Sequence, residues 1–127
     1  MDEYRVLIER SRRFLISSEM QAEKGFYDLA IFSLEQALQL FLKAMLIKNG
    51  VDYPRIHGVR RLLNILGKIS GDKKIEMMLG KYSLELGVLE DAYITSRYIP
   101  REYNKGDYDR VKVVVERIIN DLGGYNN

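Results

Sequence analysis

Apolar residues recur along most of the chain at spacings of three and four positions, which is the period of an α-helix. The pattern predicts helices at residues 2–23, 26–49, 58–70, from 72 to the residues before Pro100, and 107–122. No segment alternates apolar and polar residues between turn signals, as a half-buried strand would. We therefore expect an all-α protein, a four- or five-helix antiparallel up-and-down bundle, with residues 1–127 forming a single domain.

The second predicted helix, 26–49, is apolar almost all the way round. A helix of this kind must be surrounded by other helices, so we expect it at the centre of the bundle. Leu38 and Leu42 lie in its middle and should be buried. Charged and amide side chains interrupt the helix too often for a membrane span, which needs about 20 mainly apolar residues. We therefore expect no membrane association.

Particular residues mark where helices begin, bend and end. Asp72 should cap the fourth helix and Asp107 the fifth, because a carboxylate can accept hydrogen bonds from the free amides of a first turn. Gly80 and Gly87 interrupt the fourth helix, where each costs about 1 kcal/mol relative to alanine. That helix should therefore bend or split in two. Residues 51–56 and 100–106 read as connecting loops, each with one of the two prolines.

The composition excludes several kinds of chemistry. Without cysteine the chain has no disulfide, thiol nucleophile or zinc–thiolate site, and with one histidine, His57, it cannot build a two-histidine metal site alone. We expect no metal and no cofactor. The net charge of +2 is too balanced for an overall nucleic-acid footprint. No secretion signal is visible, so we expect a cytoplasmic protein.

Three polar residues of the second helix, Gln36, Gln39 and Lys43, are spaced by three and four positions and so share one stripe, which Glu35 borders. A lysine is rarely buried without a partner. Two interpretations stay open. The stripe faces solvent, with Lys43 extending into water, or it faces a charged partner or a second subunit.

A second candidate segment runs from Tyr93 to Arg101. Tyr93 and Arg97 are one helical turn apart, which suits a cation–π contact. The planar guanidinium of Arg97 can also bind a carboxylate or a phosphate. Alternatively, Arg97 caps the fourth helix while Tyr98 fills the core. For His57, which stands at the start of the third helix, we expect a capping or packing role.

Taken in chain order, these residues resemble the HEPN family (higher eukaryote and prokaryote nucleotide-binding). The matching residues are Gln36-Ala37-x-Gln39-x-x-x-Lys43-Ala44, Gly50, Pro54 and His57 in a P-x-x-H arrangement, Leu62-Leu63, and Tyr93-x-x-x-Arg97-Tyr98. Order and spacing agree over residues 5–120, nearly the whole chain. The resemblance implies a small helical bundle that commonly dimerises. Many relatives partner a separate nucleotidyltransferase, and some are metal-independent RNases that act as toxins.

The RNases that this family contains use an arginine followed, a few residues later, by a histidine. Arg97 matches the arginine, but Tyr98 follows it where a polar residue is usual, and Glu102, Tyr103 and Asn104 stand where the histidine would be. Losing an acid/base group typically costs about 100- to 10,000-fold in rate. The resemblance therefore implies a domain that lacks this mechanism, and we assign no catalytic residue.

We expect a non-catalytic or degenerate HEPN-like domain, in which Gln39 stands where the family usually has a glutamate. It would bind a nucleotide or RNA phosphate, or a nucleotidyltransferase partner, as a homodimer within a toxin–antitoxin-type system. Two alternatives are a metal-independent RNase that uses Arg97 and a protein-interaction module without a ligand. The candidate binding residues are Gln36, Gln39, Lys43, Tyr93, Arg97, Tyr98 and Arg101.

Overall fold

The structure is a computed structural model that describes residues 2–52, 55, 57–98 and 101–125, with residues 95–98 described by their backbone alone. These described residues form six α-helices and no β-strand. The helices are α1 (Glu3–Glu23), α2 (Tyr27–Lys48), α3 (Val59–Ser70), α4 (Lys73–Lys81), α5 (Ser83–Tyr98) and α6 (Lys105–Asp121). The predicted all-α bundle is confirmed, with one more helix than expected.

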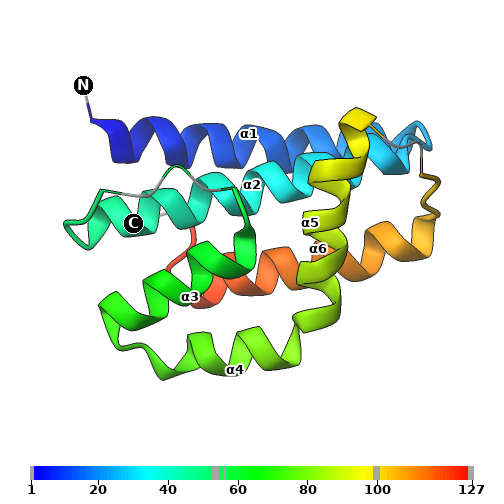
Figure 1. The fold of residues 1–127 in the computed structure, drawn as a ribbon. Helices are drawn as coiled ribbons and strands as arrows, with labels where there is room; N and C mark the ends of the chain where they lie inside the picture. The colour runs from blue at the N-terminus through cyan, green and yellow to red at the C-terminus, as the bar shows by residue number, and fades with distance from the viewer. Residues whose placement is uncertain (1, 53–54, 56, 99–100, 126–127) are drawn as a thin grey trace.

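Helix α2 lies at the centre of the bundle, as its apolar sequence predicts. It runs antiparallel to α1, with which it forms the most extensive helix–helix contact, and it also packs against α3, α5 and α6. Figure 1 shows α5 crossing the direction of α1 and α2 steeply. Helix α4 lies at the edge of the bundle, where it packs against α3 and α5 (Figure 1).

The core is built around the apolar face of α2. Leu38 and Leu42 are fully buried, as predicted. Small residues on the neighbouring face let α1 come close, so that the Ser11 hydroxyl donates a hydrogen bond of 2.6 Å to the carbonyl oxygen of Ala37. Contrary to the expectation from its polar residues, α2 is by length and composition apolar enough to cross a membrane. Most of it is buried inside the bundle, however, like the core helix of a soluble protein.

The fourth predicted helix is split in two, as its glycines suggested. Helix α4 ends at Lys81, with Tyr82 as its C-cap between Gly80 and Gly87, and α5 begins at Ser83. The Tyr82 ring is nearly buried and thus anchors the corner in the core. The predicted cap of α4 is confirmed, because the Asp72 carboxylate accepts a hydrogen bond of 3.0 Å from the backbone N–H of Lys74.

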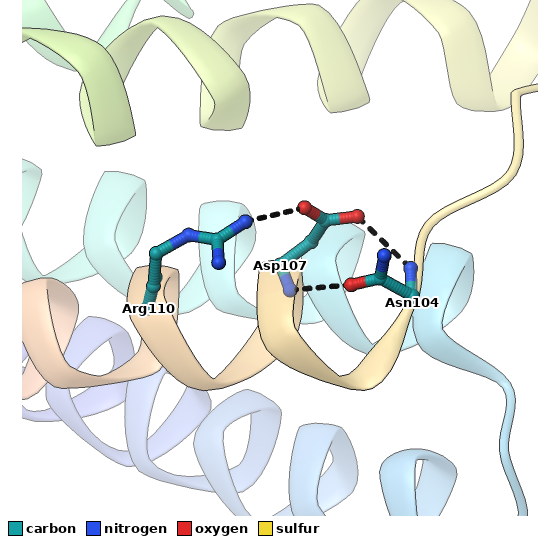
Figure 2. A network of polar contacts seen from close by, with 3 residues as sticks. All are labelled: Asn104, Asp107 and Arg110. Carbon is teal, nitrogen blue, oxygen red and sulfur yellow. Dashed lines mark hydrogen bonds and ion pairs between the residues drawn. The ribbon is translucent and has the colours of Figure 1, made fainter.

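The expected cap of α6 was wrong by three residues. Asn104, not Asp107, is the N-cap, and its side-chain oxygen accepts a 2.9 Å hydrogen bond from the backbone N–H of Asp107. The Asp107 carboxylate in turn accepts from the backbone N–H of Asn104 at 2.9 Å and from Arg110 at 2.7 Å (Figure 2). This reciprocal capping box satisfies more first-turn donors than a lone aspartate would, so the helix begins earlier, at Lys105.

Candidate functional site

A row of polar side chains lies inside the bundle along one face of α2. Glu35, Gln39 and Lys43 follow each other at intervals of four residues, which places them one above the other on the helix. Glu35 is fully buried, and Gln39 and Lys43 are only 4% and 8% exposed. We call these three residues the polar ladder. Buried charged groups are costly in a small core, so the polar ladder is the first candidate for a functional site.

Glu35 forms the inner end of the polar ladder. Its two carboxylate oxygens accept hydrogen bonds from the side-chain amides of Gln36, at 2.7 Å, and Gln39, at 2.8 Å. Burial raises the pKa of Glu35 to about 7, although both amides and the positive charge of Lys43 act to lower it. The nearby carboxylate of Glu90 raises this pKa further. Glu35 therefore changes its protonation state near neutral pH.

The Gln39 carboxamide is the hub of the polar ladder, with a hydrogen-bond partner in each of its four directions. Its Nε2 donates to Glu35 and, at 3.3 Å, to the backbone carbonyl of His57. Its Oε1 accepts from the Lys43 ammonium at 3.0 Å and lies 3.3 Å from Nδ1 of His57.

These contacts fix both the orientation of the Gln39 amide and the tautomer of His57. A carbonyl and a carboxylate only accept, so Nε2 must face them, and an ammonium only donates, so Oε1 must face it. Nδ1 of His57 can then bond to Oε1 only by donating a proton. In the neutral imidazole the other nitrogen, Nε2, is left as an acceptor.

Lys43 forms the outer end of the polar ladder. Burial lowers the pKa of its ammonium group, while the negative charge of Glu35 opposes this effect. A positive charge in a site with little water acts more strongly on an approaching anion than one on the open surface, because the local dielectric is lower.

Beside the polar ladder, three aromatic rings from three segments form a stack. The His57 imidazole lies on the Tyr93 ring with 5.4 Å between centroids and 24° between planes. Tyr93, in α5, lies in turn on Phe32 of α2, with corresponding values of 6.3 Å and 16°. His57 is exposed, whereas Tyr93 and Phe32 are half-buried, so the stack ends at an exposed ring.

The rim next to His57 is formed by α3 and α5. Glu90 of α5 makes an ion pair with Arg60 in the first turn of α3. Gly58 lies so close to Glu90 that a Cβ atom at this position would be 2.8 Å from the Glu90 carboxylate. Without a Cβ atom at Gly58, the start of α3 can lie against the Glu90 carboxylate of α5.

The remaining predicted site residues lie towards the end of α5 and beyond it. Arg97 and Tyr98 belong to the last turn of α5, and their side chains lie outside the described residues. Arg101 is half-exposed, lies 3.7 Å from the Asp91 carboxylate and has its guanidinium 5.2 Å from the centre of the Tyr103 ring. It also lines a hollow of about 110 Å³ between α5 and α6.

The structure corrects the solvent-facing interpretation of the stripe on α2. Gln39 and Lys43 are buried within this one chain, and Gln36 is half-buried. The physical reason is the helix period: residues 35, 39 and 43 face α5 and the start of α3, where polar partners are available. Gln36 lies to one side and reaches back to Glu35.

Sequence analysis noted Glu35 only as a neighbour of the stripe and not as a site residue, and it did not find Glu90 or Phe32. The signal for Glu35 was present, because the spacing of four that joins it to Gln39 and Lys43 is more regular than the stripe from Gln36. Glu90 and Phe32 could not be found in this way, since only the fold brings their segments together.

Within the described part of the chain, no group of three or more histidine, aspartate or glutamate side chains is placed to hold a metal. The site offers instead a fixed ammonium, a fixed carboxamide and an aromatic surface that reaches solvent.

A family model for the HEPN domain matches residues 4–125, which covers the six helices except for Glu3 and includes the polar ladder and the aromatic stack. No match was found among the curated proteins or among the solved structures. The match connects the chain with nucleotide- or RNA-related functions. Because the model spans nearly the whole chain, the protein belongs to the HEPN family.

Proposed function

We propose that this HEPN domain binds the phosphate of a nucleotide or RNA at the surface over the polar ladder, without cleaving it. The observation that carries the proposal is the ladder itself, whose hub, Gln39, holds both a buried ammonium and an exposed imidazole. A bundle needs no such group for stability, since well-packed apolar residues would often be at least as stabilising.

Two positive groups are proposed to attract the phosphate. Lys43 is the fixed point charge of the polar ladder. Arg97 lies one helical turn beyond Tyr93 in α5, and its planar guanidinium can donate paired hydrogen bonds to phosphate oxygens. We propose Arg97 as the main anchor, with Gln36, Tyr98 and Arg101 as further contacts.

Affinity measurements on Arg97 variants test this function. The ligands are ATP and a short single-stranded RNA, each at two salt concentrations. Arg97→Lys should weaken binding, because the charge stays but the paired donors are lost. Arg97→Ala should weaken it by about 10-fold or more and reduce the salt dependence by about one phosphate contact.

The matched control is Arg117→Ala, which removes one exposed positive charge from α6. It should leave the affinity nearly unchanged. If Arg97→Lys and Arg97→Ala lower the melting temperature and leave the affinity of the folded protein unchanged, Arg97 is a structural cap and the phosphate-anchor role is overturned.

We also propose a homodimer, with the outward side of α2 as the shared surface. Leu29, Gln36, Leu40 and Ile47 share one stripe of α2 beside the polar ladder, and Leu29 is 47% exposed. A two-fold interface on this stripe would place both sites next to each other.

Sedimentation of the protein at micromolar concentrations should give a dimer. Leu29→Asp should shift it towards monomer, because the new charge would be buried in the interface. Leu84→Asp, at a leucine of α5 that is 78% exposed, is the matched control and should leave the dimer intact. A monomer for the unmodified protein counts directly against the proposal.

The purified protein should cleave RNA poorly or not at all, because no histidine follows Arg97 at the positions that the family's RNases use. The measurement is RNA cleavage in the presence of a chelator. Robust cleavage that Arg97→Ala abolishes would instead support the RNase alternative and make Glu102 a candidate acid or base.

We keep the expected cytoplasmic location as a proposal. A nucleotidyltransferase partner and a toxin–antitoxin setting are proposals that rest on family membership. A pull-down from native lysate tests them. It should recover a nucleotidyltransferase as a separate chain, and mass spectrometry of the bound fraction should detect co-purified nucleotides. If neither is recovered, these proposals lose their support.

A further inference from the structure

The aromatic stack ends on a ring that faces solvent. Phe32 and Tyr93 are half-buried, but His57, the third ring, is exposed. One face of its imidazole is covered by Tyr93. Because His57 as a whole is exposed, its exposed surface belongs to the edge of the ring and the face away from Tyr93.

The exposed ring is held more firmly than a surface histidine usually is. Its Nδ1 bonds to Gln39, and its backbone carbonyl accepts from the same carboxamide. Gly58, the next residue, is close-packed against Glu90, so the chain on that side is fixed too. A ring that is already ordered loses little conformational entropy when another ring stacks on it.

We propose that the outer face of the His57 imidazole is a stacking platform for an unpaired nucleobase, so that the ligand of this site carries a base as well as a phosphate. The proposal rests on the proposed function, because it names the class of ligand that the same site would take. A free nucleotide and a single-stranded RNA share this chemistry, since both present an unpaired base.

The platform gives the site a means of preferring nucleotides over anions that lack a base. Every base has a flat π-face that can stack on an aromatic side chain, whatever its hydrogen-bonding edge. The acceptor Nε2 of His57 adds one polar group at the edge of the platform. The polar ladder beneath supplies charge, and the ring supplies the contact that a bare phosphate lacks.

The test compares His57→Phe with His57→Leu, two variants that both lose the bond to Gln39 and differ in the presence of a ring. The probes are ATP, a short single-stranded RNA and inorganic tripolyphosphate, which has phosphates and no base. His57→Leu should weaken ATP and RNA binding by about 10-fold or more relative to His57→Phe. Tripolyphosphate should bind both variants equally.

A second readout uses the lack of tryptophan in the chain. His57→Trp places a single tryptophan on the platform, and stacking of a base should quench its fluorescence. ATP and RNA should quench it, and tripolyphosphate should not. Tighter and more salt-dependent binding of RNA than of ATP would identify RNA as the source of the base.

The outcomes separate this inference from the proposed function. Equal ATP affinity of His57→Phe and His57→Leu, without quenching in His57→Trp, overturns the platform while phosphate binding stands. A loss of equal size in both variants also overturns it, because His57 would then act through Gln39 and not through its ring. If the unmodified protein binds none of the three probes, the proposed function fails and the platform fails with it.

Discussion

A single carboxamide, that of Gln39, connects two turns of α2 with the residue that leads into α3. A glutamate at this position would set acceptor atoms against Glu35 and the carbonyl of His57, with no donor to offer either of them. The amide supplies donors on one side and an acceptor on the other. This explains physically why position 39 holds glutamine here while the buried carboxylate stands one turn earlier, at Glu35.

The titration of Glu35 predicts how stability depends on pH. Its pKa is raised from 4.5 to about 7 in the folded protein, so between these values the folded state binds more protons than the unfolded state. Stability should therefore fall as the pH rises through this window, by up to about 3 kcal/mol, since one pKa unit corresponds to about 1.4 kcal/mol. Urea denaturation at several pH values between 5 and 8 measures it.

The control for this prediction is Glu35→Gln, which cannot ionise. Its stability should vary less over the same range than that of the unmodified protein, and the difference between the two proteins is the contribution of Glu35. Parallel pH profiles for both proteins would show that Glu35 does not titrate in this window.

At the scale of the helices, the sequence predicted which helices exist better than it predicted the residues at which they begin and end. The three- and four-residue period is local, so each predicted helix appears, including the central α2. The start of α6 depends on a capping box in which Asn104 and Asp107 bond to each other's backbone N–H groups. The sequence analysis considered acidic caps alone and therefore found Asp107 but not Asn104. The corner at Tyr82 depends on burying one ring in a core that several helices build together.

The candidate site, too, could be predicted only in part: local sequence patterns reveal some of its residues, and the fold alone reveals the others. Gln36, Gln39 and Lys43 could be selected from α2 alone, because polar residues stand out on an apolar helix. The burial of these residues could not be predicted from α2 alone, because it depends on how α5 and the start of α3 pack against α2. The stack of His57 on Tyr93 joins residues far apart in sequence, so only the fold reveals it.

Two glycines on neighbouring helices should respond in opposite ways to alanine. Gly80 is exposed in α4, and no atom lies within 4 Å of an added Cβ. Gly80→Ala should therefore stabilise the protein by about 0.5–1 kcal/mol. At Gly67 in α3 an added Cβ would lie 2.9 Å from Cγ2 of Ile75, so Gly67→Ala should destabilise by about 1–3 kcal/mol.

Thermal or urea unfolding of both variants measures the two effects, and each serves as the control for the other. A stabilising Gly67→Ala would mean that α3 and α4 pack less closely than the structure shows.

At the scale of the whole molecule, one helix carries both the core and the candidate site. Leu38→Ala and Leu42→Ala should each destabilise by about 2–5 kcal/mol, because both leucines are fully buried and truncation leaves a cavity. Leu84→Ala should cost less than about 0.5 kcal/mol, since Leu84 is exposed. Urea denaturation compares the three.

Losses below 0.5 kcal/mol at both Leu38 and Leu42 would contradict the central position of α2. Because the polar ladder shares this helix, a variant in either leucine should be checked for folding before any effect on binding is assigned to it.

The position of α4 at the edge of the bundle predicts how fast its backbone amides exchange with solvent. It packs against α3 and α5, away from the contact between α1 and α2 (Figure 1). A short peripheral helix can detach while the rest of the protein stays folded, at a smaller free-energy cost than global unfolding. In amide hydrogen–deuterium exchange, α4 should therefore lose protection first and the middle of α2 last. Such an exchange profile would separate a slow-exchanging centre, α2 with the polar ladder, from a peripheral helix, α4, that opens and closes on its own.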